Sequence, residues 1–165
     1  MEQKFIIAVY VDNKAGVLTR VTSMFTRRNF NIDTLTVGET ERKEYSRITI
    51  SMIGDEYVKE QLINQLKKLF VVKKIEMLEG EAMQRELMLI KVENKAESRS
   101  DIMTAVDVFR ANVIDYSPES MCIEVTGSPS KIDAFVNLMQ PFGILEMCRT
   151  GVVALDRGNQ TLFSE

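Results

Sequence analysis

The residues best placed to do chemistry lie between Asp12 and Gly38, where Gly16 stands at the predicted start of a helix. An extended run rich in β-branched residues precedes this glycine, and apolar residues follow it at helical spacing. The first turn of a helix has unpaired backbone N–H groups and a partial positive charge, so it can bind a carboxylate. The pattern indicates a site that presents backbone to a small anion and has no evident catalytic side chain.

A free amino acid is the ligand that this loop would suit. Its carboxylate would accept hydrogen bonds from the N–H groups of Gly16, Val17 and Leu18, and Gly16 has no Cβ to block its approach. Asn13 can bond to a carboxylate or to an ammonium group, and Asp12 is a candidate counter-charge for the ammonium.

Asn31 could act like Asn13, from the same chain or from a partner, and Ile32 could join Val17 and Leu18 as an apolar wall. A small site of this kind distinguishes side chains mainly by volume. The run DNKAG is also an ordinary turn-and-cap sequence, and the apolar residues could belong to the core. From spacing alone, both interpretations stay open.

Composition removes several classes of function. The 165 residues include no histidine, which excludes the commonest general base and metal ligand, and no nucleotide-binding or nucleophile motif is present. The formal charge of −3 gives no field that attracts nucleic acid. Cys122 and Cys148 match no metal or redox spacing, and we find no signal peptide or membrane span. We expect a non-catalytic cytoplasmic protein that binds no metal.

The predicted elements of the first half follow the order βαββαβ, the ferredoxin-like arrangement. The third strand has one apolar face and one polar face, which predicts an antiparallel sheet with helices on one side only. Asp55 is a plausible N-cap for the second helix. The expected strands cover residues 4–11, 32–38, 45–53 and 71–78, and the first helix covers residues 16–28.

The second half repeats this order. Ser98 or Ser100 can cap its first helix, Ser128-Pro129 is a strong start for its second, and residues 144–155 carry its last strand. We therefore expect an α+β protein with two ferredoxin-like domains in tandem, over residues 1–79 and 86–165, joined by a linker at 80–85. One open sheet face in each half favours at least a homodimer.

Two stretches resemble a known family. The run Asn13-x-x-Gly16-Val17-Leu18-x-Arg20-Val21, followed by Phe25-x-Arg27-Arg28-x-Phe30-Asn31-Ile32, closely resembles an ACT domain, and more narrowly that of the regulatory (small) subunits of acetolactate synthase. The family usually has serine where Thr34 stands, and threonine keeps the hydroxyl. The run Arg149-Thr150-Gly151-Val152-Val153-Ala154-Leu155-x-Arg157-Gly158 resembles the family's C-terminal signature.

The resemblance implies a partner and an effector. In such enzymes a large catalytic subunit carries thiamine diphosphate, magnesium and FAD, and condenses two pyruvates to 2-acetolactate and CO2. The small subunit binds it, raises its activity and confers feedback inhibition by a branched-chain amino acid, usually valine. The implied effector site lies between two protomers, and comprises Asn13, Ala15, Gly16, Val17 and Leu18 of one chain with Asn31 and Ile32 of the other.

Other functions share this fold. A stand-alone amino-acid-sensing ACT regulator of another enzyme or of transcription is the main alternative, although the chain has no helix-turn-helix or basic segment. An RNA-binding RRM would need exposed stacking aromatics. An acylphosphatase would need a phosphate-binding loop with arginine before the first helix, and that loop is not present.

Overall fold

The computed structural model describes residues 1–163, which form two compact units. The first unit combines residues 1–83 with residues 152–163, and the second comprises residues 84–151. The expected second domain, residues 86–165, therefore does not keep its last segment, because the chain returns to the first unit at Val152. The expected linker is also shorter, since the strand that opens the second half begins at Met83.

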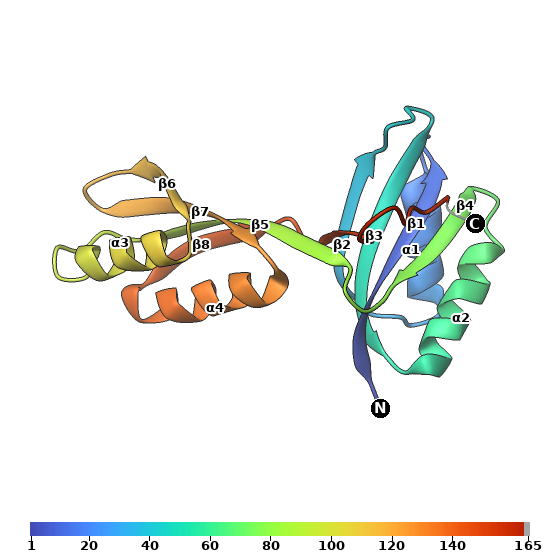
Figure 1. The fold of residues 1–165 in the computed structure, drawn as a ribbon, viewed down its shortest axis with the longest axis horizontal. Helices are drawn as coiled ribbons and strands as arrows, with labels where there is room; N and C mark the ends of the chain where they lie inside the picture. Colours follow the sequence, from blue (N-terminus) through green and yellow to red (C-terminus); the bar gives the residue numbers. More distant parts are fainter. Residues whose placement is uncertain (164–165) are drawn as a thin grey trace. The chain divides into compact units, whose positions relative to one another are not determined.

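The first unit has the expected order of elements, and its strands form one antiparallel sheet with the order β2-β3-β1-β4 (Figure 1). β1 therefore lies inside the sheet, and β2 and β4 form its edges. The elements are β1 (Gln3–Asp12), α1 (Val17–Arg27), β2 (Ile32–Glu39), β3 (Tyr45–Gly54), α2 (Glu56–Lys67) and β4 (Val72–Leu78).

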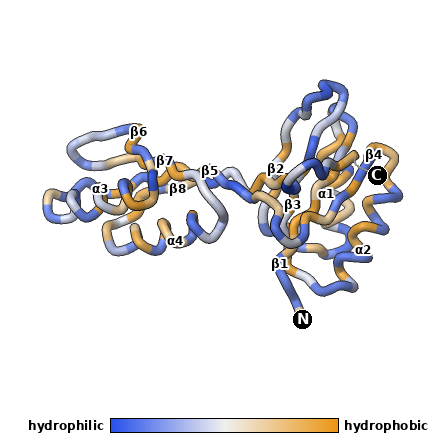
Figure 2. The backbone as a smooth tube through the Cα atoms, in the orientation of Figure 1, coloured by the Kyte–Doolittle hydropathy of each residue, from blue (hydrophilic) through white to orange (hydrophobic). Residues whose placement is uncertain are grey.

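The core of this unit lies between the sheet and its two helices. Alternate residues of β1, beginning with Phe5, point into it and pack with the buried side of α1, as the alternating pattern predicts. Figure 2 shows hydrophobic residues along the inner strands, and hydrophilic residues along the β2–β3 hairpin at 39–44. The core includes Phe5, Ile7, Val9, Val11, Val21, Phe25, Ile48, Ile50, Leu62 and Leu66.

The opposite face of this sheet is partly covered by residues 152–163, which we call the C-terminal tail. Val152 and Ala154 pack with Ile6, Ala8 and Leu78 in a small buried cluster. Figure 1 shows the tail, in dark red, lying across the sheet. The face that the sequence predicts to be open is thus covered in part by the chain itself, because Ile6 and Ala8 of β1 present apolar side chains on it.

The second unit repeats the fold with strand order β6-β7-β5-β8. Met88, Ile90 and Val92 of β5 pack against α3 and α4 in a separate core. Ser128 caps α4 as expected, since its hydroxyl accepts a hydrogen bond from the Lys131 N–H. The elements are β5 (Met83–Glu93), α3 (Arg99–Val108), β6 (Asn112–Tyr116), β7 (Ser120–Gly127), α4 (Pro129–Met139), the 3-10 turn η1 (Gln140–Phe142) and β8 (Ile144–Arg149).

The predicted last strand at 144–155 is interrupted. β8 ends at Arg149, and the separate strand β9 (Val153–Leu155) belongs to the tail. Gly151 between them has φ 83°, a left-handed conformation that breaks an extended run and that glycine adopts without strain. The prediction of one strand over residues 144–155 was wrong because Thr150 and Val152, on either side of Gly151, are β-branched residues typical of a strand.

Candidate effector site

The backbone at the start of α1 is open, as the sequence predicts. Gly16 occupies the N-cap position with φ 85° and has no side chain to cap the helix. The Val17 N–H has only a long bond of 3.4 Å to the Lys14 carbonyl. The N–H groups of Leu18 and Thr19 have no acceptor within residues 1–163. This turn therefore has donors to offer a carboxylate.

The starts of two other helices are occupied by side chains. At α2, Asp55 Oδ1 accepts a hydrogen bond from the Val58 N–H at 2.9 Å. At α4, the Ser128 hydroxyl accepts from the Lys131 N–H at 3.3 Å. The open start of α1 is thus a property of its own sequence, which places Gly16 where these helices have a capping side chain.

Asn13 is held by the β2–β3 hairpin. Its side-chain Nδ2 donates to the Lys43 carbonyl at 2.9 Å and to Glu39 Oε2 at 3.4 Å, and its backbone N–H donates to the Glu44 carbonyl at 2.8 Å. These bonds fix the glycine loop to the end of β2. Sequence reasoning missed this role of the hairpin, and the charged run ETERKE was its only local signal.

The apolar residues of the predicted site differ in exposure. Val17 is buried in the core, so only its backbone can reach a ligand, whereas Leu18 is 42% exposed and Ala15 is exposed. Asp12 Oδ1 lies 3.6 Å from Lys73 Nζ. This ion pair neutralises Asp12, and weakens its expected role as the counter-charge of an ammonium group.

Asn31 and Ile32 lie at the other end of the sheet. Ile32 pairs with Met52, which pairs with Phe5, whereas the glycine loop follows Asp12. Seven residues of strand between Phe5 and Asp12 correspond to about 23 Å at about 3.3 Å per residue. One copy of the chain therefore does not bring the two halves of the predicted site together.

The edge strand β2 is open to pairing. Its sequence IDTLTVGE contains no lysine or proline; its charged residues are Asp33 and Glu39, and its register with β3 shifts between Ile32 and Thr34. The other edge, β4, carries Lys73 and Lys74. The two edges thus differ, and β2 is the one suited to pair with another strand.

The tail brings charged groups onto the back of the sheet. Arg47 Nη2 donates to the Ala154 carbonyl at 2.8 Å, and burial lowers the pKa of Arg47. Burial and a hydrogen bond with Asp156 raise the pKa of Glu76 to about 7, against the opposing attraction of Arg47 and Lys74. Phe163 packs edge-on against Tyr10, with ring centroids 4.8 Å apart.

The two arginines of the C-terminal signature have partners within the chain. Arg149 Nη2 bonds to Glu86 Oε2 at 2.7 Å, and its Nη1 bonds to Asp133 Oδ1 at 2.7 Å. Arg157 Nε donates to the Glu81 carbonyl at 2.7 Å. Both arginines therefore have structural contacts, Arg149 in the second unit and Arg157 in the first.

Neither a metal centre nor a membrane-spanning helix is found in the described part of the chain. Residues 1–163 contain no cluster of three or more histidine, cysteine or acidic side chains able to hold a metal ion. Over the same residues, no helix is both long and apolar enough to span a membrane.

Family models match both halves of the chain. Residues 7–74 match the "AHAS small subunit-like ACT domain", and residues 85–158 match the "Small subunit of acetolactate synthase". The first match contains the whole glycine loop with Asn31 and Ile32, and the second contains the C-terminal signature. The two stretches that carry the resemblance thus lie inside matched regions.

Individual relatives agree over nearly the full length. A probable acetolactate synthase small subunit of Archaeoglobus fulgidus is 48% identical, over 95% of this chain and 99% of the relative. One from Methanothermobacter thermautotrophicus is 46% identical, over 95% of both chains. The crystal structure of the acetolactate synthase small subunit from Thermotoga maritima superposes with a TM-score of 0.89 at 38% identity, over 96% of this chain and 99% of that one. The chain therefore belongs to the family of acetolactate synthase small subunits, and its N-terminal half is an ACT domain.

Proposed function

We propose that this small subunit activates the catalytic subunit of acetolactate synthase and makes it sensitive to feedback inhibition by a branched-chain amino acid, with valine the first candidate. The observation that carries the sensor role is the open first turn of α1. Its Leu18 and Thr19 N–H groups have no acceptor within residues 1–163, and Gly16 leaves them accessible. An α-carboxylate is small enough to accept both bonds, and the helix dipole favours its charge.

The rest of the site requires a second copy of the chain. If two β2 strands pair antiparallel over their full length, Ile32 of one copy lies level with Glu39 of the other. Glu39 is in contact with Asn13, so the glycine loop of the second copy lies near Asn31 and Ile32 of the first. This pairing would bring together two groups that are about 23 Å apart in one copy. The exposed Leu18 then supplies an apolar surface for a branched side chain.

Binding between two copies gives the effector a means of control. An amino acid in this interface stabilises the arrangement of copies that binds it best, by no more than its difference in affinity between arrangements. Inhibition follows if the arrangements contact the catalytic subunit differently. The condensation of two pyruvates, and its thiamine diphosphate, magnesium and FAD, belong in this proposal to the catalytic subunit, and the expected location is the cytoplasm.

Calorimetric titration of the purified chain with valine, leucine and isoleucine tests the sensor role. We expect saturable binding of at least one of them, with two effectors per interface, one for each copy of the glycine loop. Titration of the chain into its catalytic subunit, with acetolactate formation as the readout, tests the activator role. Absence of binding for all three amino acids would remove the sensor role, and absence of activation would remove the activator role.

A further inference from the structure

The outer surface of the helical layer of the first unit carries a basic groove. Two adjoining hollows, of about 680 and 370 Å³, share Arg27 and Leu69. We call them together the α1 groove. Its cations are Arg20, Arg27, Arg28 and Lys68, and its other lining residues are Thr19, Thr22, Ser23, Met24, Thr26, Gln65 and Leu69. None of the seven predicted effector-site residues lines either hollow.

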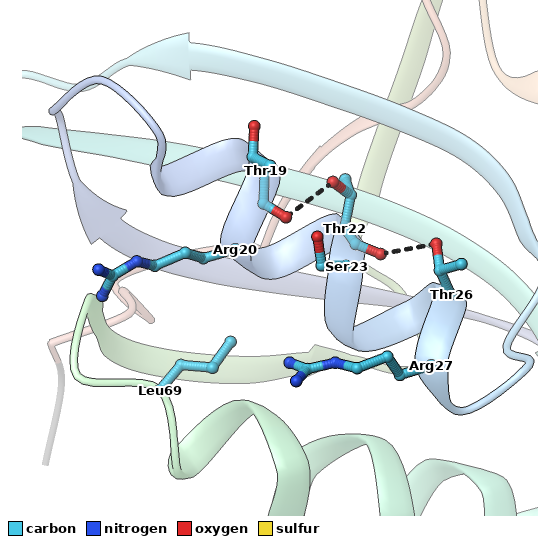
Figure 3. A pocket seen from close by; sticks show the side chains of 7 residues that line it. All are labelled: Thr19, Arg20, Thr22, Ser23, Thr26, Arg27 and Leu69. Atoms are coloured by element: carbon cyan, nitrogen blue, oxygen red, sulfur yellow. Dashed lines mark hydrogen bonds between the residues drawn. The ribbon is translucent and has the colours of Figure 1, made fainter.

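The cations of the groove have no acidic partner. None of the four forms a salt bridge within residues 1–163, although the chain as a whole has a formal charge of −3. α1 contains no acidic residue at all. Arg20 and Arg27 are seven residues apart, so they lie on one side of α1 at about 10 Å along its axis. Figure 3 shows them on the side of the helix that faces Leu69.

Helix stability explains only part of this charge. Arg27 and Arg28 end α1 and Lys68 ends α2, where cations suit the helix dipole. Arg20 instead stands in the first turn of α1, where the dipole disfavours a cation. Its side chain is exposed, so it has no packing role that would account for this position. A role in binding accounts for an arginine at position 20, whereas the stability of the helix does not.

The groove is built to bind acceptor groups. Thr22 Oγ1 donates its proton to the Leu18 carbonyl at 2.8 Å, and Thr26 Oγ1 donates to the Thr22 carbonyl at 3.2 Å. These hydroxyls have no proton left for a partner. The donors that remain include the guanidinium groups of Arg20 and Arg27, and guanidinium groups pair best with carboxylates and can bind them through two parallel bonds.

An apolar contact adjoins the charges. Leu69 lines both hollows. The next residue, Phe70, lies outside them; it is 83% exposed, and Lys73 Nζ lies 4.6 Å from its ring centroid. Exposed aromatic residues and arginines are the types that most often dominate the energy of protein interfaces. A partner that fits this surface carries acidic side chains next to an apolar one.

We propose that the α1 groove is a docking surface for an acidic segment of the catalytic subunit. This inference rests on the proposed function, since that function supplies the partner. Acidic side chains of the segment pair with Arg20 and Arg27, and an apolar side chain packs on Leu69 and Phe70. Charge pairs of this kind accelerate association and make the complex weaker as salt rises.

A charge reversal in the full-length chain tests the proposal. The variant Arg20→Glu/Arg27→Glu is compared with the control Arg85→Glu/Arg110→Glu, which changes the net charge equally but leaves the groove intact. The affinity of each for the catalytic subunit is measured at low and moderate salt. We expect the groove variant to bind at least tenfold more weakly and with less dependence on salt, while the control binds like the wild type.

Three other results would overturn the proposal. In the first, the groove variant binds the catalytic subunit within twofold of the wild type, and the wild type still activates it. This result contradicts the docking role of the groove and leaves the proposed function intact. The second is a wild-type chain that does not bind the catalytic subunit, which removes the proposed function and the groove with it. The third is loss of self-association on sedimentation, which would make the groove a contact between copies. Arg20→Gln/Arg27→Gln is the variant to use if the reversed one does not fold.

Discussion

Replacing Gly16 by aspartate should weaken effector binding without unfolding the chain. Gly16 has φ 85°, and a Cβ built there meets no atom within 4 Å, so backbone strain is the only local penalty. A non-glycine residue in this conformation costs about 1 kcal/mol, and aspartate tolerates it better than most. In a unit of this size, that corresponds to a fall in Tm of about 4–8 °C. The variant should therefore fold.

The new carboxylate would stand where the carboxylate of the effector belongs. Two like charges about 4 Å apart repel by about 1 kcal/mol in bulk water, and by about 4 kcal/mol at the effective dielectric constant of a protein surface. These limits correspond to losses of affinity of about fivefold and about a thousandfold. Because the proposed site is covered by a second copy, we expect a loss nearer the higher value.

Calorimetry with valine measures this loss, and two controls isolate its cause. Gly16→Ala introduces the backbone strain without the charge. Gly80→Asp introduces a carboxylate at another open glycine with φ 68°. Gly80→Asp should bind valine like the wild type. Gly16→Ala adds a Cβ beside the bound carboxylate, so it should bind valine more weakly than the wild type but more tightly than Gly16→Asp. All three variants should still activate the catalytic subunit. Wild-type affinity in Gly16→Asp would refute the placement of the effector at this helix start.

Four further substitutions test other parts of the structure. The pKa of Glu76 is raised from 4.5 to about 7, so between these pH values the folded state holds a proton that the unfolded state releases. The free energy of unfolding of the wild type should therefore fall as pH rises through this range. Glu76→Gln should remove this fall, which urea titrations at several pH values measure. Arg149→Met should lower the free energy of unfolding by about 3 kcal/mol, because it leaves the buried Glu86 carboxylate unpaired. Lys95→Met, which breaks an exposed pair with Glu93, should leave the urea midpoint of unfolding nearly unchanged. Val37→Lys, at an exposed position of β2, should weaken the proposed dimer in sedimentation experiments with little effect on folding, and an unchanged dimer would exclude pairing through β2.

Local patterns were enough to predict most elements of the fold. The third strand was expected at 45–53 and is Tyr45–Gly54, and the last helix begins at Pro129 as its Ser-Pro start predicts. These features depend on alternation and capping, which neighbouring residues determine. The open start of α1 was predicted for the same reason, because Gly16 acts on its own turn.

Features that join distant segments were not predicted. Val152 and Ala154 alternate like residues of any half-buried strand, and nothing beside them in the sequence identifies Ile6 and Ala8 as their partners. Asn13 likewise depends on the carbonyl of Lys43, thirty residues away. The α1 groove was not predicted either, although Arg20 in the first turn of α1 was an available sign of it.

The C-terminal tail affects which surface is available for two copies of the chain to associate. Two open sheet faces would favour face-to-face pairing, but the tail already covers part of the first sheet with Val152 and Ala154. Arg47 and Arg157 hold it there through backbone carbonyls. The apolar drive for face-to-face pairing is thereby reduced, while the β2 edge carries no lysine or proline. Pairing through β2 is then favoured, and it is also the pairing that brings the glycine loop of one copy to Asn31 of the other.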